Sequence, residues 1–208
     1  MSDYSNLKVG IINLKLNNIY SIHQLFKYLK SKVTIIDQSI NLKKYDMIVL
    51  PGDGAFKEGM KKLKSSKLYD EIINFSKIKE KKVLGICLGM QLLFDKSSEF
   101  GFCKGLGLVN GKVTKLPKKS AFVPNIGWRK LKTSKNKIFN LFNKSYFYFS
   151  HSFYAVPKKS KIITSFINHG NKKICTSIQY ENIFGIQFHP EKSHKDGINL
   201  IKKVLDYK

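Results

Sequence analysis

The sequence contains no long apolar run. None of its hydrophobic stretches reaches the roughly 18 consecutive apolar residues that a membrane-spanning helix requires. The first residues, Met1 to Lys8, also lack the apolar centre of a secretory signal peptide. We therefore expect a soluble, cytoplasmic protein without a membrane partner.

Cysteine is scarce. Cys87, Cys103 and Cys175 are far apart in the chain, and no C-x-x-C pair suggests a zinc site or a redox dithiol. This odd, scattered set fits a reduced compartment, and we expect no bound metal. Each cysteine is expected to be a small buried hydrophobic residue unless its neighbours indicate chemistry.

Acidic residues and arginine are also few. The chain has 14 Asp and Glu against 38 Lys and Arg, giving a formal net charge of +24, and Arg129 is the only arginine. This balance leaves a basic nucleic-acid-binding module as an alternative from another class. Sites that read bases or grip phosphates favour arginine, however, and the lysines here are spread along the whole chain. We therefore expect a solvated basic surface and no nucleic-acid partner.

The apolar content is sufficient for a full core. At 208 residues, 42% hydrophobic, the chain falls near the size of one domain, and we expect residues 1–208 to form it. The first half alternates short apolar runs with amphipathic stretches, which is typical of βα units around a parallel sheet. Strands are predicted at 9–12, 33–36, 47–50 and 83–86, and helices at 22–29, with Asn18 as its cap, 68–75 and 88–94.

The second half has a different character. Beyond Gly101, glycines separate short strand-like segments, which favours antiparallel pairing. These segments are 107–116, 146–149, 162–167, 174–179 and 183–187, and a closing helix is predicted at 197–205. The pattern predicts an α/β protein with a β-rich C-terminal half.

The sharpest local signal is a cysteine with a glycine two residues away on each side. In Gly85-Ile86-Cys87-Leu88-Gly89 it stands where an apolar strand meets a helix, the arrangement of a nucleophile elbow. Such a tight turn needs glycine at both flanks to avoid side-chain clashes. A helix N-terminus also favours thiolate over thiol, so Cys87 is predicted to be a nucleophile.

Two further segments could complete an acyl-transfer site. His189 follows a predicted strand, and Glu191 could hold its imidazole in one tautomer, although a loop histidine can equally be a surface residue. The loop Pro51-Gly52-Asp53-Gly54 follows another strand, where backbone N–H groups could stabilise an oxyanion. Its other interpretation is a simple tight turn.

Taken together and in this order, the segments 51–56, 85–94 and 187–193 resemble the class I, triad-type glutamine amidotransferases. Further segments are similar to the HisH-like glutaminase subunits of imidazole glycerol phosphate synthase, namely 105–108, 124–128, 148–154 and 192–193. The resemblance covers essentially the whole chain. It implies a three-layer α/β fold, with a mostly parallel central sheet between helices and an antiparallel C-terminal half.

The resemblance also implies the roles of individual residues. Cys87 is the nucleophile, His189 the general acid and base, and Glu191 its orienting partner. Glutamine is held by Gln91 and Asp95, one turn apart on the helix, and by backbone groups of Gly52, Ser152 and Phe153. Oxyanion donors are backbone N–H groups of Leu88 and of Gly52-Asp53, with or without a loop movement. The partner-facing residues are Asn18, Trp128, Tyr148 and Lys192. No cofactor is implied.

The implied partner is a (β/α)8-barrel, HisF-like cyclase that uses the ammonia in histidine biosynthesis. Three departures from the family pattern concern the partner-facing side: the loop Asn13–Asn18, Asp53 in place of an apolar residue, and Arg129 in place of asparagine. They leave open a HisH-like paralogue that supplies ammonia to a sugar amidotransferase in surface-polysaccharide synthesis.

Overall fold

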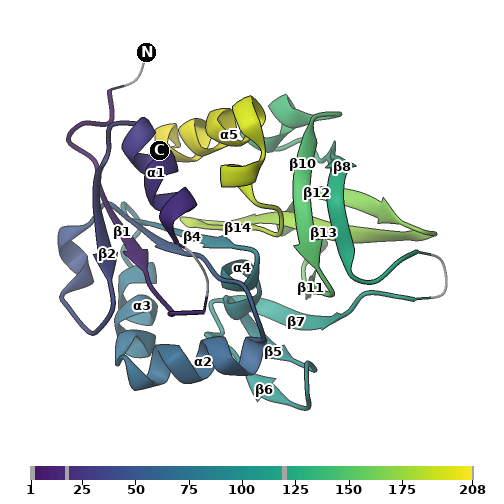
Figure 1. Cartoon of the computed structure of the whole chain (residues 1–208), viewed down its shortest axis with the longest axis horizontal. Coiled ribbons are helices and arrows are strands. Elements are labelled where there is room, and N and C mark those ends of the chain that lie inside the picture. The colour runs from purple at the N-terminus through teal and green to yellow at the C-terminus, as the bar shows by residue number, and fades with distance from the viewer. Residues whose placement is uncertain (1–2, 17–18, 119–120, 208) are drawn as a thin grey trace.

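An eight-stranded sheet forms the centre of the computed structural model, which describes residues 3–16, 19–118 and 121–207 (Figure 1). Its five parallel strands lie in the order β2 (Lys32–Ile36), β1 (Lys8–Ile12), β3 (Met47–Leu50), β4 (Lys82–Ile86) and β14 (Ile183–Ile186). Three antiparallel strands continue it: β13 (Lys172–Tyr180), β12 (Ile163–His169) and β9 (Lys132–Thr133). The predicted parallel centre and antiparallel C-terminal part are confirmed.

Helices cover both faces of the parallel strands. The helices α1 (Tyr20–Tyr28) and α5 (His194–Asp206) lie on one face, and α2 (Phe56–Ser65) and α3 (Leu68–Ser76) lie on the other (Figure 1). Side chains alternate along each strand, so Val9 and Ile11 pack into the cluster that contains α1 and α5, whereas Ile12 packs into the cluster of α2 and α3. The three-layer α/β arrangement follows.

Two smaller sheets complete the fold. One contains β11 (Phe153–Pro157), β7 (Val109–Lys115), β5 (Phe94–Ser97) and β6 (Cys103–Lys104) in that order. The other pairs β10 (Tyr146–His151) with β8 (Asn125–Lys130). Short 3₁₀ turns occupy Leu42–Lys44, Phe139–Phe142, Ser160–Ile162 and Pro190–Lys192.

The helix after Cys87 is shorter than predicted. Helix α4 spans Leu88–Leu92, and Phe94 already begins β5. The cause is competition for backbone carbonyls, because Leu92 O accepts from Leu106 N–H and Leu93 O accepts from Leu108 and Val109 N–H. A neighbouring segment therefore ends the helix.

Two other helix predictions need correction. The N-cap of α1 is Ile19, and Asn18, the predicted cap, lies outside the described residues. Helix α2 was not predicted, although Phe56, Met60 and Leu63 recur at helical spacing and are buried. Across the described ranges, no helix has both the length and the apolar character needed to cross a bilayer.

Candidate active site

Cys87 occupies a strained turn between β4 and α4. Its backbone has φ 53° and ψ −112°, a conformation that L residues rarely adopt. A Cβ on Gly85 would lie 2.7 Å from backbone atoms of Gly89, and a Cβ on Gly89 would overlap the carbonyl oxygen of Leu50. Both glycines are therefore required for the turn, and the predicted nucleophile elbow is confirmed as a structure.

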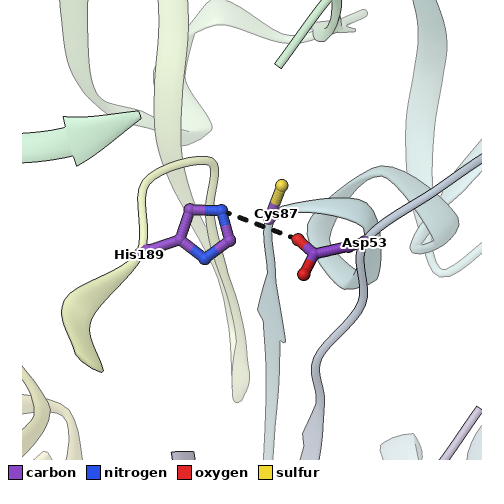
Figure 2. A group of neighbouring side chains, drawn as sticks. All are labelled: Asp53, Cys87 and His189. Atoms are coloured by element: carbon purple, nitrogen blue, oxygen red, sulfur yellow. Dashed lines mark ion pairs between the residues drawn. The ribbon is translucent and has the colours of Figure 1, made fainter. Parts of the chain in front are cut away.

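Three loops bring the predicted residues together. Strands β3, β4 and β14 are neighbours and run parallel, so the segments after them meet at one edge of the sheet. Asp53, Cys87 and His189 follow these strands, and one ligand-type atom from each lies within 4.8 Å of the others (Figure 2). Cys87 and His189 are buried, whereas the Asp53 side chain is half exposed.

His189 is held by its backbone and by Glu191. Its N–H donates to Tyr148 O at 2.9 Å, and its Nδ1 lies 2.8 Å from Glu191 Oε1. Burial by itself would lower the pKa of His189, but the neighbouring Cys87 sulfur and Glu191 carboxylate outweigh it and raise the pKa to about 10. The Nε2 atom is buried without a hydrogen-bond partner among the described residues. The ring is thus oriented, protonated at neutral pH, and directs Nε2 towards Cys87.

A cavity of about 320 Å³ opens beside Cys87. Gln91, Ser152 and Phe153 line it, as the resemblance implied. The Gln91 amide nitrogen donates to Phe153 O at 2.9 Å and to Gln187 Oε1 at 3.0 Å. Because both amide hydrogens are used, Gln91 can offer a bound molecule only its oxygen, as an acceptor.

Glu99 and Asp53 are the carboxylates that line this cavity, and the placement of Asp95 on the helix was wrong. Asp95 lies on β5, after the helix has ended, and its Oδ2 accepts from Gly111 N–H at 2.8 Å. Glu99 lines the cavity, and its Oε2 accepts from Phe56 N–H at 2.7 Å, which caps α2. Glu99 was missed because a charged residue in an irregular segment carries no periodic signal.

A second missed residue contacts the cysteine directly. The fully buried Gln187 has its Nε2 3.6 Å from Cys87 Sγ, and Gln91 fixes its amide orientation by donating to Gln187 Oε1. Gln187 therefore donates towards the sulfur. Its position two residues before His189, at the end of a buried strand, was the available signal.

One of the expected oxyanion donors, the Leu88 N–H, is not free in this conformation. Leu88 N–H donates to Gly52 O at 3.2 Å, so the Gly52 carbonyl occupies the position that an oxyanion would need. Gly52 also lines a small separate cavity with Asp53, His189 and Lys192, apart from the larger one beside Cys87. The Gly52-Asp53 peptide must turn before Leu88 can donate elsewhere.

Three of the residues expected to face a partner, Trp128, Tyr148 and Lys192, lie together. Trp128 is 40% exposed and stacks on His194, with ring centroids 5.1 Å apart. Tyr148 packs edge-on against Trp128 at 6.1 Å, and Lys192 Nζ lies 5.9 Å from the Tyr148 ring centroid. Arg129 folds back along its own strand, donating to Asn125 Oδ1 and to two main-chain carbonyls. Asn18 lies outside the described residues.

His151 is a buried neutral histidine next to this group. Burial lowers the pKa of His151 to about 4, and its ring nitrogens contact Phe153 O and Asn125 Nδ2, each at 2.9 Å. Since the main-chain oxygen only accepts, Nδ1 carries the hydrogen and Nε2 accepts from Asn125. Protonation at Nε2 would place two donors against each other.

We expect acid to destabilise the fold through His151. The folded state takes up this proton near pH 4 and the unfolded chain near pH 6.5, so stability falls below pH 6.5. Relative to pH 7, the wild type at pH 4 should lose about 3 kcal/mol more unfolding free energy than His151→Gln. Urea unfolding at both pH values measures this, with His23→Gln as the control. Equal losses in wild type and His151→Gln would contradict it.

Comparisons with known proteins agree with this geometry. A family model described as glutamine amidotransferase class-I matches residues 11–205. The imidazole glycerol phosphate synthase subunit HisH of Chlorobaculum tepidum is 36% identical over 201 residues, covering 96% of this chain and 100% of the relative. The HisH subunit of Pyrococcus furiosus is 42% identical over 197 residues, covering 94% and 96%.

A solved structure supports the fold. PurLQS from Thermotoga maritima aligns with a TM-score of 0.75 at 19% identity, covering 97% of this chain and 98% of that chain. The curated relatives match along nearly their whole lengths, as does the family model along this chain. The chain therefore belongs to the class-I glutamine amidotransferases and, within them, to the family of imidazole glycerol phosphate synthase HisH subunits.

Proposed function

We propose that this chain is the glutaminase subunit of an imidazole glycerol phosphate synthase. It hydrolyses glutamine to glutamate and passes ammonia to a HisF-like, (β/α)8-barrel cyclase, which forms imidazole glycerol phosphate and AICAR in histidine biosynthesis. The observation that carries the proposal is the convergence of Cys87 with the His189–Glu191 pair beside a cavity with polar walls. The reaction needs no cofactor.

The proposed chemistry uses a thiolate at Cys87 and an imidazolium at His189. The Cys87 thiolate attacks the side-chain carboxamide carbon of glutamine, and the His189 imidazolium donates its Nε2 proton to the departing nitrogen. Ammonia leaves and a thioester remains on Cys87. His189, now neutral, takes a proton from water, whose oxygen attacks the thioester and releases glutamate. Glu191 stabilises the imidazolium in both steps through Nδ1.

The cavity walls match the rest of the substrate. We assign Glu99 to the α-ammonium group of glutamine, because the other carboxylate that lines the cavity, Asp53, lies 3.8 Å from His189 Nε2. Gln91 Oε1 accepts from an N–H of the substrate, because both Gln91 amide hydrogens are used internally. Main-chain groups of Ser152 and Phe153 line the same cavity and bind the polar ends of glutamine.

Glu99→Gln is expected to raise the KM for glutamine by about 10- to 100-fold, because it removes a charge-assisted contact. The amide side chain introduced at position 99 keeps an oxygen that can accept from Phe56 N–H, so the free energy of unfolding in urea should change little. The matched control is Asp95→Asn, because the Asp95 carboxylate accepts from Gly111 N–H and does not line the cavity. Steady-state kinetics of glutamate release separates the two variants. If KM rises in Asp95→Asn and not in Glu99→Gln, the assignment is wrong.

A closed oxyanion site predicts that the subunit alone is nearly inactive. The Leu88–Gly52 hydrogen bond must break, and the Gly52-Asp53 peptide must turn to present its N–H groups. We assign the trigger to a partner that docks on the face containing Trp128, Tyr148 and Lys192, since Lys192 also lines the cavities beside Gly52 and Cys87. Direct transfer through this face keeps ammonia from becoming ammonium.

The deciding experiment measures glutamate release by the full chain alone, with a cyclase barrel subunit, and with that subunit and its own ligand. We expect activity only in the mixtures, and more with the ligand. A complex that forms and stays inactive with ligand would contradict the proposal. The relatives reported above are named as synthase subunits, which supports the cyclase over a sugar amidotransferase. Cytoplasmic location stays a prediction from the sequence, which has no long apolar run and whose scattered cysteines fit a reduced compartment.

A further inference from the structure

Asp53 places a third metal-binding atom beside the cysteine and histidine. Its Oδ1 lies 3.8 Å from His189 Nε2, and the two atoms are joined by the dashed line in Figure 2. Cys87 Sγ completes a group in which all three atoms lie within 4.8 Å of one another. The position is distinctive because an apolar residue there would leave only two such atoms.

Thiolate, imidazole and carboxylate together form a typical zinc-binding set. Zinc bonds of about 2.0–2.3 Å in a tetrahedral site place ligand atoms roughly 3.3–3.6 Å apart. The 3.8 Å between Asp53 Oδ1 and His189 Nε2, and the distances of at most 4.8 Å to the sulfur, must therefore contract towards this range. The Asp53 side chain is 50% exposed on a loop, so it can supply that movement without disturbing the core.

Independent features of His189 favour a metal. The Nε2 atom is buried and faces the Cys87 sulfur and Asp53 Oδ1, its ion-pair partner at 3.8 Å, but it makes no hydrogen bond among the described residues. On the other side of the ring, Nδ1 contacts the buried Glu191 carboxylate at 2.8 Å. A carboxylate behind a histidine ligand fixes the ring and the tautomer in zinc sites. The second shell is thus already in place.

We propose that Asp53, Cys87 and His189 form a site for a zinc ion, with a fourth position open to the cavity for water. Binding releases the Nε2 proton of His189 to solvent, and the ion then occupies both the sulfur and Nε2, so glutamine cannot be attacked until the ion leaves. The site is inhibitory and the reaction does not use the ion. Binding is independent of the function proposed above, and only the inhibition rests on it.

The first test titrates the metal-free full chain with Co²⁺, a spectroscopic substitute for zinc. A thiolate-to-cobalt absorption band should appear at one ion per chain. Asp53→Val should weaken binding at least about tenfold, because one of three ligands is lost. Asp53→His restores a ligand atom and should bind Co²⁺ more tightly than Asp53→Val. The control for the loss of negative charge is Asp70→Asn, on an exposed part of α3. A loss of Co²⁺ affinity in Asp53→Val smaller than this expected factor would overturn the proposal.

The second test measures the rate at which Cys87 is alkylated and needs no enzyme activity. Zinc should slow alkylation of Cys87 in the wild type and have little effect on Cys87 in Asp53→Val. The partly exposed Cys103 serves as the internal control in the same mass spectrum. Equal protection of Cys87 in both proteins would show that the Cys87–His189 pair alone binds the ion, and would overturn the role of Asp53. If both metal tests succeed and glutamine is not hydrolysed, only the proposed function fails.

Discussion

Cys87→Ser is expected to lower partner-stimulated glutamine hydrolysis by at least about 10⁴-fold, the size of loss that follows removal of an essential nucleophile. A serine hydroxyl fits the same turn but must be deprotonated before it can attack. A hydroxyl loses its proton far less readily than a thiol, so the variant lacks the ready-made anion that a thiolate supplies for the attack.

Glutamate release in the presence of saturating partner measures this effect. Cys103→Ser is the matched control, since Cys103 lies in β6, away from the site, and should retain activity within about twofold. The thermal midpoint of both variants confirms that they fold. Activity in Cys87→Ser above about one hundredth of the wild-type rate would contradict the role of Cys87 as nucleophile.

Gly89→Ala is expected to destabilise the protein by more than about 4 kcal/mol or to prevent folding, because the added methyl group would overlap the Leu50 carbonyl oxygen. The Leu50 carbonyl is buried backbone, and the methyl group would be attached to the buried backbone of Gly89, so no flexible side chain can move aside. Any relaxation must separate α4 from the end of β3 and displace Cys87. We therefore expect activity to be lost with stability.

Urea unfolding followed by circular dichroism measures this loss. Gly59→Ala is the control, because its nearest neighbours are the flexible ends of Leu92 and Leu88, at 3.0–3.4 Å. Alanine inside α2 also favours the helix by about 1 kcal/mol, so the net change should be small. A folded Gly89→Ala protein with wild-type stability and activity would show that the elbow tolerates a side chain.

Local sequence signals predicted the parallel strands and the elbow well. Residues 9–12, 33–36, 47–50 and 83–86 all lie in strands. Three of these strands are buried, and a buried parallel strand needs a continuous apolar run, whereas β2 is the largely exposed edge strand. The elbow was equally visible, since only glycine fits at Gly85 and Gly89. Both features depend on contacts close to the residues concerned, so the sequence is sufficient.

Signals failed where distant backbone groups decide the outcome. Residues 106–109 take the carbonyls of Leu92 and Leu93, which ends α4 early and moves Asp95 out of the helix. The same change brings Glu99 to the cavity. The spacing of residues near the helix indicates neither the early end of α4 nor the position of Glu99, because the donors come from a later part of the chain.

By itself, the sequence determined the α/β class and the elbow at Cys87, and through resemblance it predicted His189 and Glu191 as partners of a nucleophilic Cys87. Only the tertiary structure decided that Glu99 lines the cavity, that Gly52 O accepts from the Leu88 N–H, and that Asp53 faces His189. The physical reason is the same in each case. A residue's backbone preference is local, whereas hydrogen bonds, charges and metal ligands depend on which strands lie side by side, and β3, β4 and β14 come from distant parts of the chain.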